Sequence, residues 1–189
     1  MSASPLVSHW ISTANNVPLC PIRVRCWGHG KGKEIDQSDC VVRMNNAPTL
    51  GYKDDVGSKT SLRVISHTSV PLLLWNETRF FRQEADTVIK SGSFLSTGFF
   101  TMILALGMCD SIQVYGMIND NYCSRANHNT VPYHYYDNGR LDECQMYRAH
   151  EKAARGGHRF ITEKAIFAKW ATRKNLTFSN PSWAESNTV

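Results

Sequence analysis

Short apolar runs separated by turn residues predict a domain of alternating strands and helices. The run Cys40–Met44 predicts a buried strand that ends at the turn Asn45–Pro48. Ser61–His67 alternates between polar and apolar positions and predicts a second strand, and Ser111–Met117 predicts a third. Between these two, Thr101–Cys109 is apolar on every side, which predicts a helix packed inside the fold. This order of elements is typical of a doubly wound α/β sheet.

The C-terminal third of the chain has a different pattern. Asp142–Arg155 predicts a polar helix, and Thr162–Arg173 predicts a second helix with apolar side chains on one side and Glu163 in its first turn. Residues 176–183 (LTFSNPSW) predict one further strand at an edge of the sheet.

One junction between these elements is abrupt. Ala85–Lys90 (ADTVIK) begins like a strand, yet it meets Ser91–Phe94 with no turn, linker or helix between them. A doubly wound fold usually has a whole strand–helix unit at such a place. We therefore expect an internal deletion near 90/91.

Length and composition fit a single globular domain. The 189 residues are 42% hydrophobic and 20% charged, and no run approaches the roughly 20 apolar residues of a membrane span. The first residues also lack the features of a signal peptide. The net charge of +5 suits an anionic ligand. Because the sequence contains no nucleic-acid-binding motif, we expect no nucleic-acid partner.

Cysteines and glycosylation motifs favour the secretory pathway, although the start of the chain would suit a cytosolic protein. The sequons begin at Asn76 and Asn175. None of the cysteines has the C-x₂-C spacing of a zinc site, so we expect no metal cluster. The six cysteines, an even number as in a disulfide framework, are Cys20, Cys26, Cys40, Cys109, Cys123 and Cys144.

Ser96-Thr97-Gly98 stands directly before the apolar helical run and allows two interpretations. A Ser or Thr at this place caps a helix by accepting a hydrogen bond from a backbone N–H group. The same helix end can also bind an anion, since its free N–H groups and its dipole favour negative charge. The local sequence alone favours the plain cap.

Two other segments lack the residue spacing of the functional motifs that they partly match. The run Gly28–Lys33 (GHGKGK) lacks the spacing of a phosphate-binding P-loop, and it predicts a flexible basic loop. His150-Glu151 is not followed by a second histidine at the spacing of zinc proteases.

Two histidines are candidates for acid–base chemistry. His158 precedes the last predicted helix, where it would be either a half-exposed capping residue or a general base. His134 lies in the aromatic and polar cluster 131–139 (VPYHYYDNG), which would either line a ligand pocket or pack against the rest of the fold.

Four segments resemble, in order, the sialylmotifs of the animal sialyltransferase family. Residues 35–67 resemble the latter part of the large sialylmotif, and residues 91–117 resemble the small one. His134–Asp137 (HYYD) is similar to the short third motif, and His158–Glu163 (HRFITE) fits the His-x₄-Glu pattern of the very small motif. The segments VISHTSVPLLL and GRLDECQMY are most similar to the α-N-acetylgalactosaminide α-2,6-sialyltransferase branch. Within this branch they resemble the type that extends already sialylated core structures.

This resemblance implies an activity and a location. It implies inverting, metal-independent transfer of sialic acid from CMP-sialic acid, on a Rossmann-like variant of the GT-A fold and without a cofactor. The implied acceptor is GalNAc of sialylated core-1 O-glycans or gangliosides, in glycoproteins or glycolipids. It also implies a Golgi membrane protein with a lumenal catalytic domain, although the sequence as written has neither anchor nor signal peptide.

The resemblance also implies the roles of single residues. His158 would be the general base that deprotonates the acceptor hydroxyl, and His134 would donate a proton to the departing CMP phosphate. Gly116 would let the nucleotide lie against the end of a strand. The substrate-binding residues implied in this way are Asn45, Ser96, Thr97, Gly98, Gly116, Tyr133 and Tyr135.

The chain departs from the family pattern at two places. Residues 20–36 keep a strand at Ile22–Trp27 but lack the usual small-residue loop that touches the donor. The segment between the large and small motifs is absent at 90/91, which predicts the loss of part of the central sheet. We therefore expect a divergent segment 1–33 and a catalytic domain 34–189 with an internal deletion. The alternative is an impaired form that acts by pairing with other glycosyltransferases.

Disulfide pairs are implied by the same resemblance. Cys109 is similar to a cysteine that pairs with one at the start of the large motif, and either Cys20 or Cys26 would serve. Cys123 and Cys144 form an implied second pair that would hold the loop carrying His134.

Overall fold

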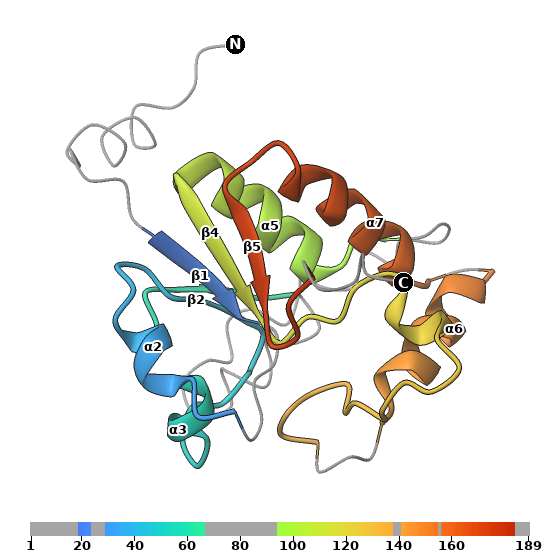
Figure 1. Cartoon of the computed structure of the whole chain (residues 1–189), viewed down its shortest axis with the longest axis horizontal. Coiled ribbons are helices and arrows are strands. Elements are labelled where there is room, and N and C mark those ends of the chain that lie inside the picture. Colours follow the sequence, from blue (N-terminus) through green and yellow to red (C-terminus); the bar gives the residue numbers. More distant parts are fainter. Residues whose placement is uncertain (1–18, 24–28, 67–93, 138–140, 155, 184–189) are drawn as a thin grey trace, which may run out of the picture.

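A parallel five-stranded sheet forms the centre of the structure (Figure 1). The computed structural model describes residues 29–66, 94–137, 141–154 and 156–183, and the backbone of 19–23. The strand order is β3-β2-β1-β4-β5, and every neighbouring pair is parallel. The strands are β1 (Leu19–Arg23), β2 (Val42–Met44), β3 (Leu62–Val64), β4 (Ser111–Tyr115) and β5 (Leu176–Ser179).

This strand order confirms the predicted Rossmann-like α/β fold. The chain moves outward from β1 to β3 and then returns to place β4 on the other side of β1. The strands expected around 40–44, 61–67 and 111–117 are present, and β5 is the expected edge strand. The strand expected at Ile22–Trp27 begins earlier, at Leu19, because Leu19–Arg23 pairs in register with Ser111–Tyr115. Residues 24–28 lie outside the described part.

Helices cover both faces of the sheet. Helix α5 (Thr97–Met108) and helix α7 (Phe160–Ala171) lie side by side on one face (Figure 1). Helix α2 (Gly32–Asp36) packs on the other face, where Ile35 contacts Tyr115, and the short helix α3 (Lys53–Val56) lies against it. The main core fills the space between the sheet and the α5–α7 pair, and it includes Val42, Phe99, Met102, Ala105, Ile112, Val114, Phe167, Leu176 and Phe178.

The prediction of a flexible loop at Gly28–Lys33 is wrong at its end, because α2 begins at Gly32. A β-carbon on Gly32 would lie 1.9 Å from the carbonyl oxygen of Lys53. Helices α2 and α3 therefore approach each other through their backbones. This contact joins residues far apart in the chain and leaves no local pattern in the sequence.

Helix α5 also differs from its prediction, because it is not buried on every side. Phe99, Met102 and Ala105 face the core, whereas Phe100 and Ile103 are 54% and 48% exposed. The described elements place the sheet on one side of α5 and α7 beside it (Figure 1). On the remaining side of α5 an apolar stripe is exposed. The exposed members of this stripe are Phe100, Ile103, Leu104 and Met108.

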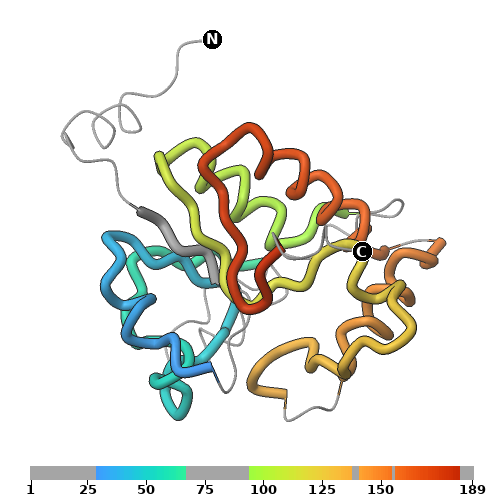
Figure 2. Tube along the Cα trace, in the orientation of Figure 1, coloured from blue at the N-terminus to red at the C-terminus, as the bar shows by residue number. Residues whose placement is uncertain are grey.

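A smaller lobe follows β4 and contains the single-turn helix η1 (Tyr122–Ser124) and helix α6 (Glu143–Lys152). The disulfide Cys123–Cys144 joins η1 to α6, which confirms the implied pair. Its core consists of Ile118, Cys123, Cys144, Tyr147 and Phe160. The trace shows this lobe and residues 29–66 on opposite sides of the molecule, with α5, α7, β4 and β5 between them (Figure 2).

The remaining cysteines and the expected junction are only partly described. Cys109 is disulfide-bonded and Cys40 is a free thiol. The side chain of Cys20, together with Cys26, Asn76 and the 90/91 junction, lies outside the described residues. None of the helices in the described part has the length and apolarity for a bilayer crossing.

Candidate functional site

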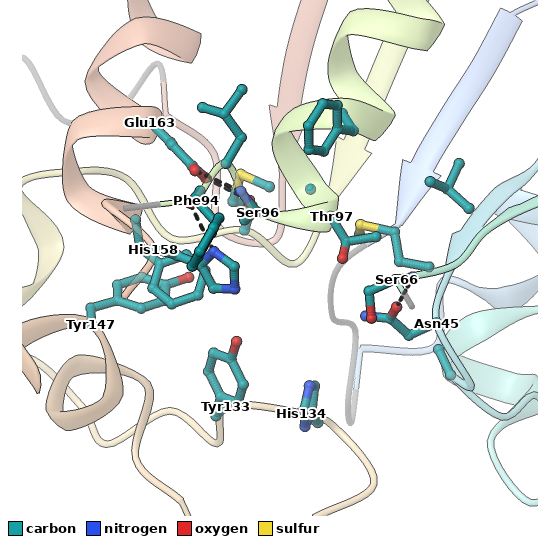
Figure 3. Close-up of a pocket in the computed structure, with 18 of the residues that line it drawn as sticks. Asn45, Ser66, Phe94, Ser96, Thr97, Tyr133, His134, Tyr147, His158 and Glu163 are labelled. Atoms are coloured by element: carbon teal, nitrogen blue, oxygen red, sulfur yellow. Dashed lines mark hydrogen bonds between the residues drawn. The ribbon is translucent and has the colours of Figure 1, made fainter. Parts of the chain in front are cut away.

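A cavity of about 920 Å³ opens at the carboxyl ends of the parallel strands. Asn45 and Ser66 reach it from the chain that follows β2 and β3, and Met117 reaches it just after β4. On the opposite side Ser96 and His158 enter from the starts of α5 and α7 (Figure 3). In open α/β sheets, ligands bind at this edge, where the strand order reverses between β1 and β4.

Ser96 is the N-cap of α5, as the local sequence predicts. Its extended backbone (φ −71°, ψ 160°) lets Oγ accept a hydrogen bond from the N–H of Phe99 at 3.1 Å. Ser96 also donates two hydrogen bonds to Glu163 in α7. The backbone N–H lies 2.8 Å from Oε1 of Glu163, and Oγ lies 2.5 Å from Oε2. The start of α5 is thereby fixed to α7.

Glu163 makes this connection from inside the protein. The residue is 4% exposed, and burial raises the pKa of its carboxyl group. The two hydrogen bonds from Ser96 and the neighbouring His158 and Lys164 oppose this rise in pKa. The carboxylate therefore serves as a fixed acceptor for Ser96 and holds the cavity-facing turn in place.

The first turn of α5 presents free hydrogen-bond donors to the cavity. Thr97 and Gly98 line it, and their N–H groups have no acceptor among the described residues. Since α5 is 12 residues long, its dipole adds partial positive charge at this end. The arrangement suits a phosphate or a carboxylate.

His158 is held in one orientation and tautomer. Its Nδ1 lies 2.9 Å from the carbonyl oxygen of Phe94. Because a carbonyl oxygen only accepts, the proton is assigned to Nδ1, and Nε2 carries the lone pair. Nε2 has no hydrogen-bond partner in the described part of the chain. A second contact, from the N–H of Phe94 to the carbonyl oxygen of Gly157 at 3.1 Å, fixes the two segments together.

His134 lies across the cavity on the loop that precedes α6 (Figure 3). Its Nδ1 is 2.6 Å from Oδ2 of Asp137, so Nδ1 carries a proton that it donates to this carboxylate. The ring stacks on Tyr136 with centroids 4.9 Å apart, and Tyr133 packs beside it at 4.4 Å. A histidine paired with a carboxylate in this way can donate a proton to an anionic ligand.

The two tyrosines named from the sequence occupy different positions. Tyr133 presents its ring to the cavity and contacts Tyr147 and Phe160 edge-on. Tyr135 also lines the cavity, but it is buried and its hydroxyl donates to the carbonyl oxygen of Pro48. Tyr135 therefore supports the wall of the cavity through its ring and anchors the loop.

Asn45 and Gly116 both lie at strand ends with positive φ. Asn45 (φ 48°) accepts the N–H of Ser66 on Oδ1 at 2.9 Å, which directs its amide toward the cavity (Figure 3). Gly116 (φ 75°) donates its N–H to Ser179 at 2.8 Å. The residue after it, Met117, is the one that lines the cavity.

Several site residues were not identified from the sequence. The His-x₄-Glu spacing was a signal for Glu163, but nothing marked the Phe94 carbonyl that orients His158. Lys164 lines the cavity although it is buried, with Nζ donating to the carbonyl oxygen of Ile118 at 2.8 Å and lying 4.9 Å from the ring centre of Tyr147. Among the described residues, no three His, Cys, Asp or Glu side chains gather closely enough to hold a metal ion.

Comparison with known proteins gives one consistent result. The family model described as glycosyltransferase family 29 (sialyltransferase) matches residues 27–88 and 71–174. A human alpha-N-acetyl-neuraminyl-2,3-beta-galactosyl-1,3-N-acetyl-galactosaminide alpha-2,6-sialyltransferase is 44% identical over 213 positions, which cover 82% of this chain. Human alpha-N-acetylgalactosaminide alpha-2,6-sialyltransferase 3 is 42% identical, with 84% of this chain and 70% of that protein covered.

The comparison also shows a difference in length. The chain spans 70% of the first human relative and 59% of its mouse counterpart. Since the 213 aligned positions outnumber the 189 residues of the chain, the human relative has residues inside the matched region that this chain lacks.

Solved structures support the fold. The crystal structure of a mammalian sialyltransferase in complex with Gal-beta-1-3GalNAc-ortho-nitrophenol superposes with a TM-score of 0.59 and 19% identity. The match covers 94% of this chain and 73% of that one.

Proposed function

Because the chain belongs to glycosyltransferase family 29, the sialyltransferases, we propose that it transfers sialic acid from CMP-sialic acid in α-2,6 linkage to a GalNAc residue. The observation that carries this proposal is the fixed tautomer of His158, whose Nδ1 is bound to the Phe94 carbonyl oxygen and whose Nε2 is left as the base. From the name of the human relative we infer that the acceptor is a sialylated Gal-β1,3-GalNAc structure, on a glycoprotein or a glycolipid.

The residues that line the cavity suit the charge of the donor. The CMP phosphate would accept hydrogen bonds from the N–H groups of Thr97 and Gly98 at the positive end of α5. The amide of Asn45 would bind from the strand side, and the ring of Tyr133 would contact the donor from the loop.

The reaction then requires removal of a proton from the acceptor hydroxyl, and donation of a proton or a hydrogen bond to the departing phosphate. Nε2 of His158 removes the proton from O6 of GalNAc, and this oxygen attacks C2 of sialic acid. The bond between C2 and the phosphate oxygen breaks, and CMP leaves with the electron pair. His134, held by Asp137, donates a hydrogen bond or its proton to the departing phosphate. Attack opposite the leaving group inverts the configuration at C2.

The proposal includes transfer without a metal ion or another cofactor. The departing group is a monophosphate, and the helix end and His134 together provide positive charge next to it. We expect the rate of transfer to be unchanged in EDTA.

A specific observation favours a second candidate function. The human relative has residues inside the matched region that this chain lacks, and α5 has an exposed apolar stripe. A chain of this kind would bind the donor nucleotide without transferring sialic acid, and would pair with an intact glycosyltransferase through the stripe. The Golgi lumen is the proposed location in both cases.

A transfer assay separates the two candidates. The chain is incubated with CMP-sialic acid and Neu5Ac-α2,3-Gal-β1,3-GalNAc, and the product is identified by mass spectrometry and linkage-specific sialidases. An added α-2,6-linked sialic acid supports the enzyme. Binding of CMP by a folded protein that produces no such product would contradict the enzyme and support the binding form.

A further inference from the structure

His150 contacts the proposed base although it is not one of the residues that line the cavity. It lies in the last turn of α6, and its Nδ1 accepts the backbone N–H of His158 at 3.2 Å. The two imidazole rings stack with centroids 5.6 Å apart and an angle of 14° between their planes. His158 is therefore held at two points, through its backbone by His150 and through its ring by Phe94.

The hydrogen bond fixes the protonation of His150. A backbone N–H only donates, so Nδ1 of His150 must carry a lone pair and its proton must be on Nε2. The imidazole of His150 is thus neutral when the contact is made. Burial lowers the pKa of His150, and the neighbouring His158 lowers it further, so both effects also favour the neutral ring.

Most charged side chains on α6, on the segment before α7 and on α7 bind partners other than the His150 ring. From the segment before α7, the guanidinium of Arg159 donates to the carbonyl oxygens of His150 and Glu151. The carboxylate of Glu151 is turned toward the start of α7, where it accepts hydrogen bonds from Ile161 and Thr162. In α7, the carboxylate of Glu163 is bound to Ser96. On α6 itself, Lys152 is exposed and Arg148 donates to the carbonyl oxygen of Cys123.

Gly157 shows that the contact between α6 and the segment before α7 is close. A β-carbon at this position would lie 2.5 Å from the carbonyl oxygen of His150 and 2.8 Å from the β-carbon of Ala153. Any side chain here would push the backbone of His158 away from α6. The sequence thus allows His150 and His158 to meet only because residue 157 is glycine.

We propose that His150 is a positioning residue for the transfer reaction, since it holds the backbone of His158 so that Nε2 stays directed into the cavity. This inference rests on the proposed function, in which His158 is the base. When His150 is protonated, it loses the acceptor for the His158 N–H and places a positive charge next to the base. We therefore expect transfer to fall at acid pH as His150 takes up its second proton.

Two substitutions separate the hydrogen bond from the ring. His150→Asn keeps an acceptor oxygen at the δ position and does not titrate, whereas His150→Phe keeps a ring and has no acceptor. We expect His150→Phe to lower kcat by about 10- to 100-fold, as misplacement of a catalytic group does, with little change in KM for CMP-sialic acid. His150→Asn should restore kcat near neutral pH and should move the acid limb of the kcat profile to lower pH.

A second readout does not depend on activity. In ¹⁵N-imidazole NMR spectra of the full chain, we expect the Nε2–H tautomer at His150 and the Nδ1–H tautomer at His158. His158 should exchange between tautomers in His150→Phe and in Gly157→Ala, but not in His150→Asn. The proposal is overturned if His158 keeps its single tautomer in His150→Phe, or if His150→Asn is as impaired as His150→Phe. Correct tautomers in a chain that transfers no sialic acid would contradict the proposed function, not the positioning by His150.

Discussion

The first and last residues of the segment His158–Glu163 have different roles in the cavity wall. His158 presents Nε2 to the cavity, whereas Glu163 points into the protein and binds both donors of Ser96. Because α7 begins between them, one short stretch sets the position of the base relative to the start of α5. The proposed base and the proposed phosphate site are therefore connected through a few buried contacts.

Removal of the Glu163 carboxylate should loosen this connection. In Glu163→Ala, the N–H and the hydroxyl of Ser96 lose their buried acceptor, and we expect the free energy of unfolding to fall by about 2–3 kcal/mol. Glu163→Gln is the matched control, because its amide can still exchange two hydrogen bonds with Ser96. Urea unfolding measures the difference, and equal stability of the Ala variant and the wild type would contradict the account.

The difference in stability between the wild type and Glu163→Gln should depend on pH. Burial raises the pKa of Glu163 above its usual 4.5 in the folded state, so the folded protein binds this proton more tightly than the unfolded chain does. The stabilising contribution is full below pH 4.5 and is lost as the pH rises through the folded pKa. We expect the wild type to lose stability relative to Glu163→Gln over this range. A difference that stays constant with pH in urea titrations would contradict the raised pKa.

Among the secondary-structure elements, helix α5 allows a test of whether its free backbone N–H groups bind the CMP phosphate. Proline is well tolerated at the first position of a helix, and Ser96 already has the extended backbone that a following proline requires. Thr97→Pro should therefore keep the helix and remove one N–H from the cavity. Calorimetry with CMP should show affinity about tenfold lower in Thr97→Pro, consistent with the loss of a charge-assisted hydrogen bond.

Thr97→Ala is the control for this experiment, since it removes the side chain and keeps the N–H. Its affinity for CMP should stay close to that of the wild type. If Thr97→Pro binds CMP as tightly as Thr97→Ala does, the phosphate does not lie at the start of α5.

Sequence patterns predicted most elements but not their contacts with one another. Strands β2 to β5 follow from apolar runs of strand length, and Ser96 follows from its place before α5. The helical start at Gly32 was missed, because it depends on a contact with Lys53 that no local pattern reveals. The burial of α5 was overestimated because apolarity on every side does not show how many neighbours a helix has.

The candidate site could be predicted as a set of residues, but not as a connected arrangement. The motifs pointed to His134, His158 and Ser96, all of which line one cavity. The orientation of His158 depends on a backbone carbonyl and on His150, and a backbone carbonyl is not visible in residue identities. These partners become apparent only when the chain is folded.

At the scale of the whole molecule, Asn175 tests the proposed lumenal location. It is exposed in the turn between α7 and β5, at the opposite end of the sheet from the cavity, and Thr177 of its sequon is also exposed. In mammalian cells that express the full chain, we expect a glycan at Asn175 that peptide N-glycosidase removes. Asn175→Gln should lose the corresponding shift in gel mobility and keep the activity.

Asn129→Gln, at an exposed asparagine outside any sequon, is the control for gel mobility. Asn76, the other sequon, lies outside the described residues and is substituted separately, so that the two shifts can be distinguished. Wild-type protein with no glycan at Asn175 would contradict a lumenal location with this turn accessible.

We claim that this chain, although shorter than its relatives, contains a working transfer site with His158 as the base. The most direct measurement compares sialic acid transfer and CMP affinity in the wild type, in His158→Ala and in the exposed control His29→Ala. We expect His158→Ala to bind CMP normally and to transfer about 10²- to 10⁴-fold more slowly, as the loss of a general base predicts. His29→Ala should match the wild type in both respects. Transfer by His158→Ala at the wild-type rate would contradict the claim.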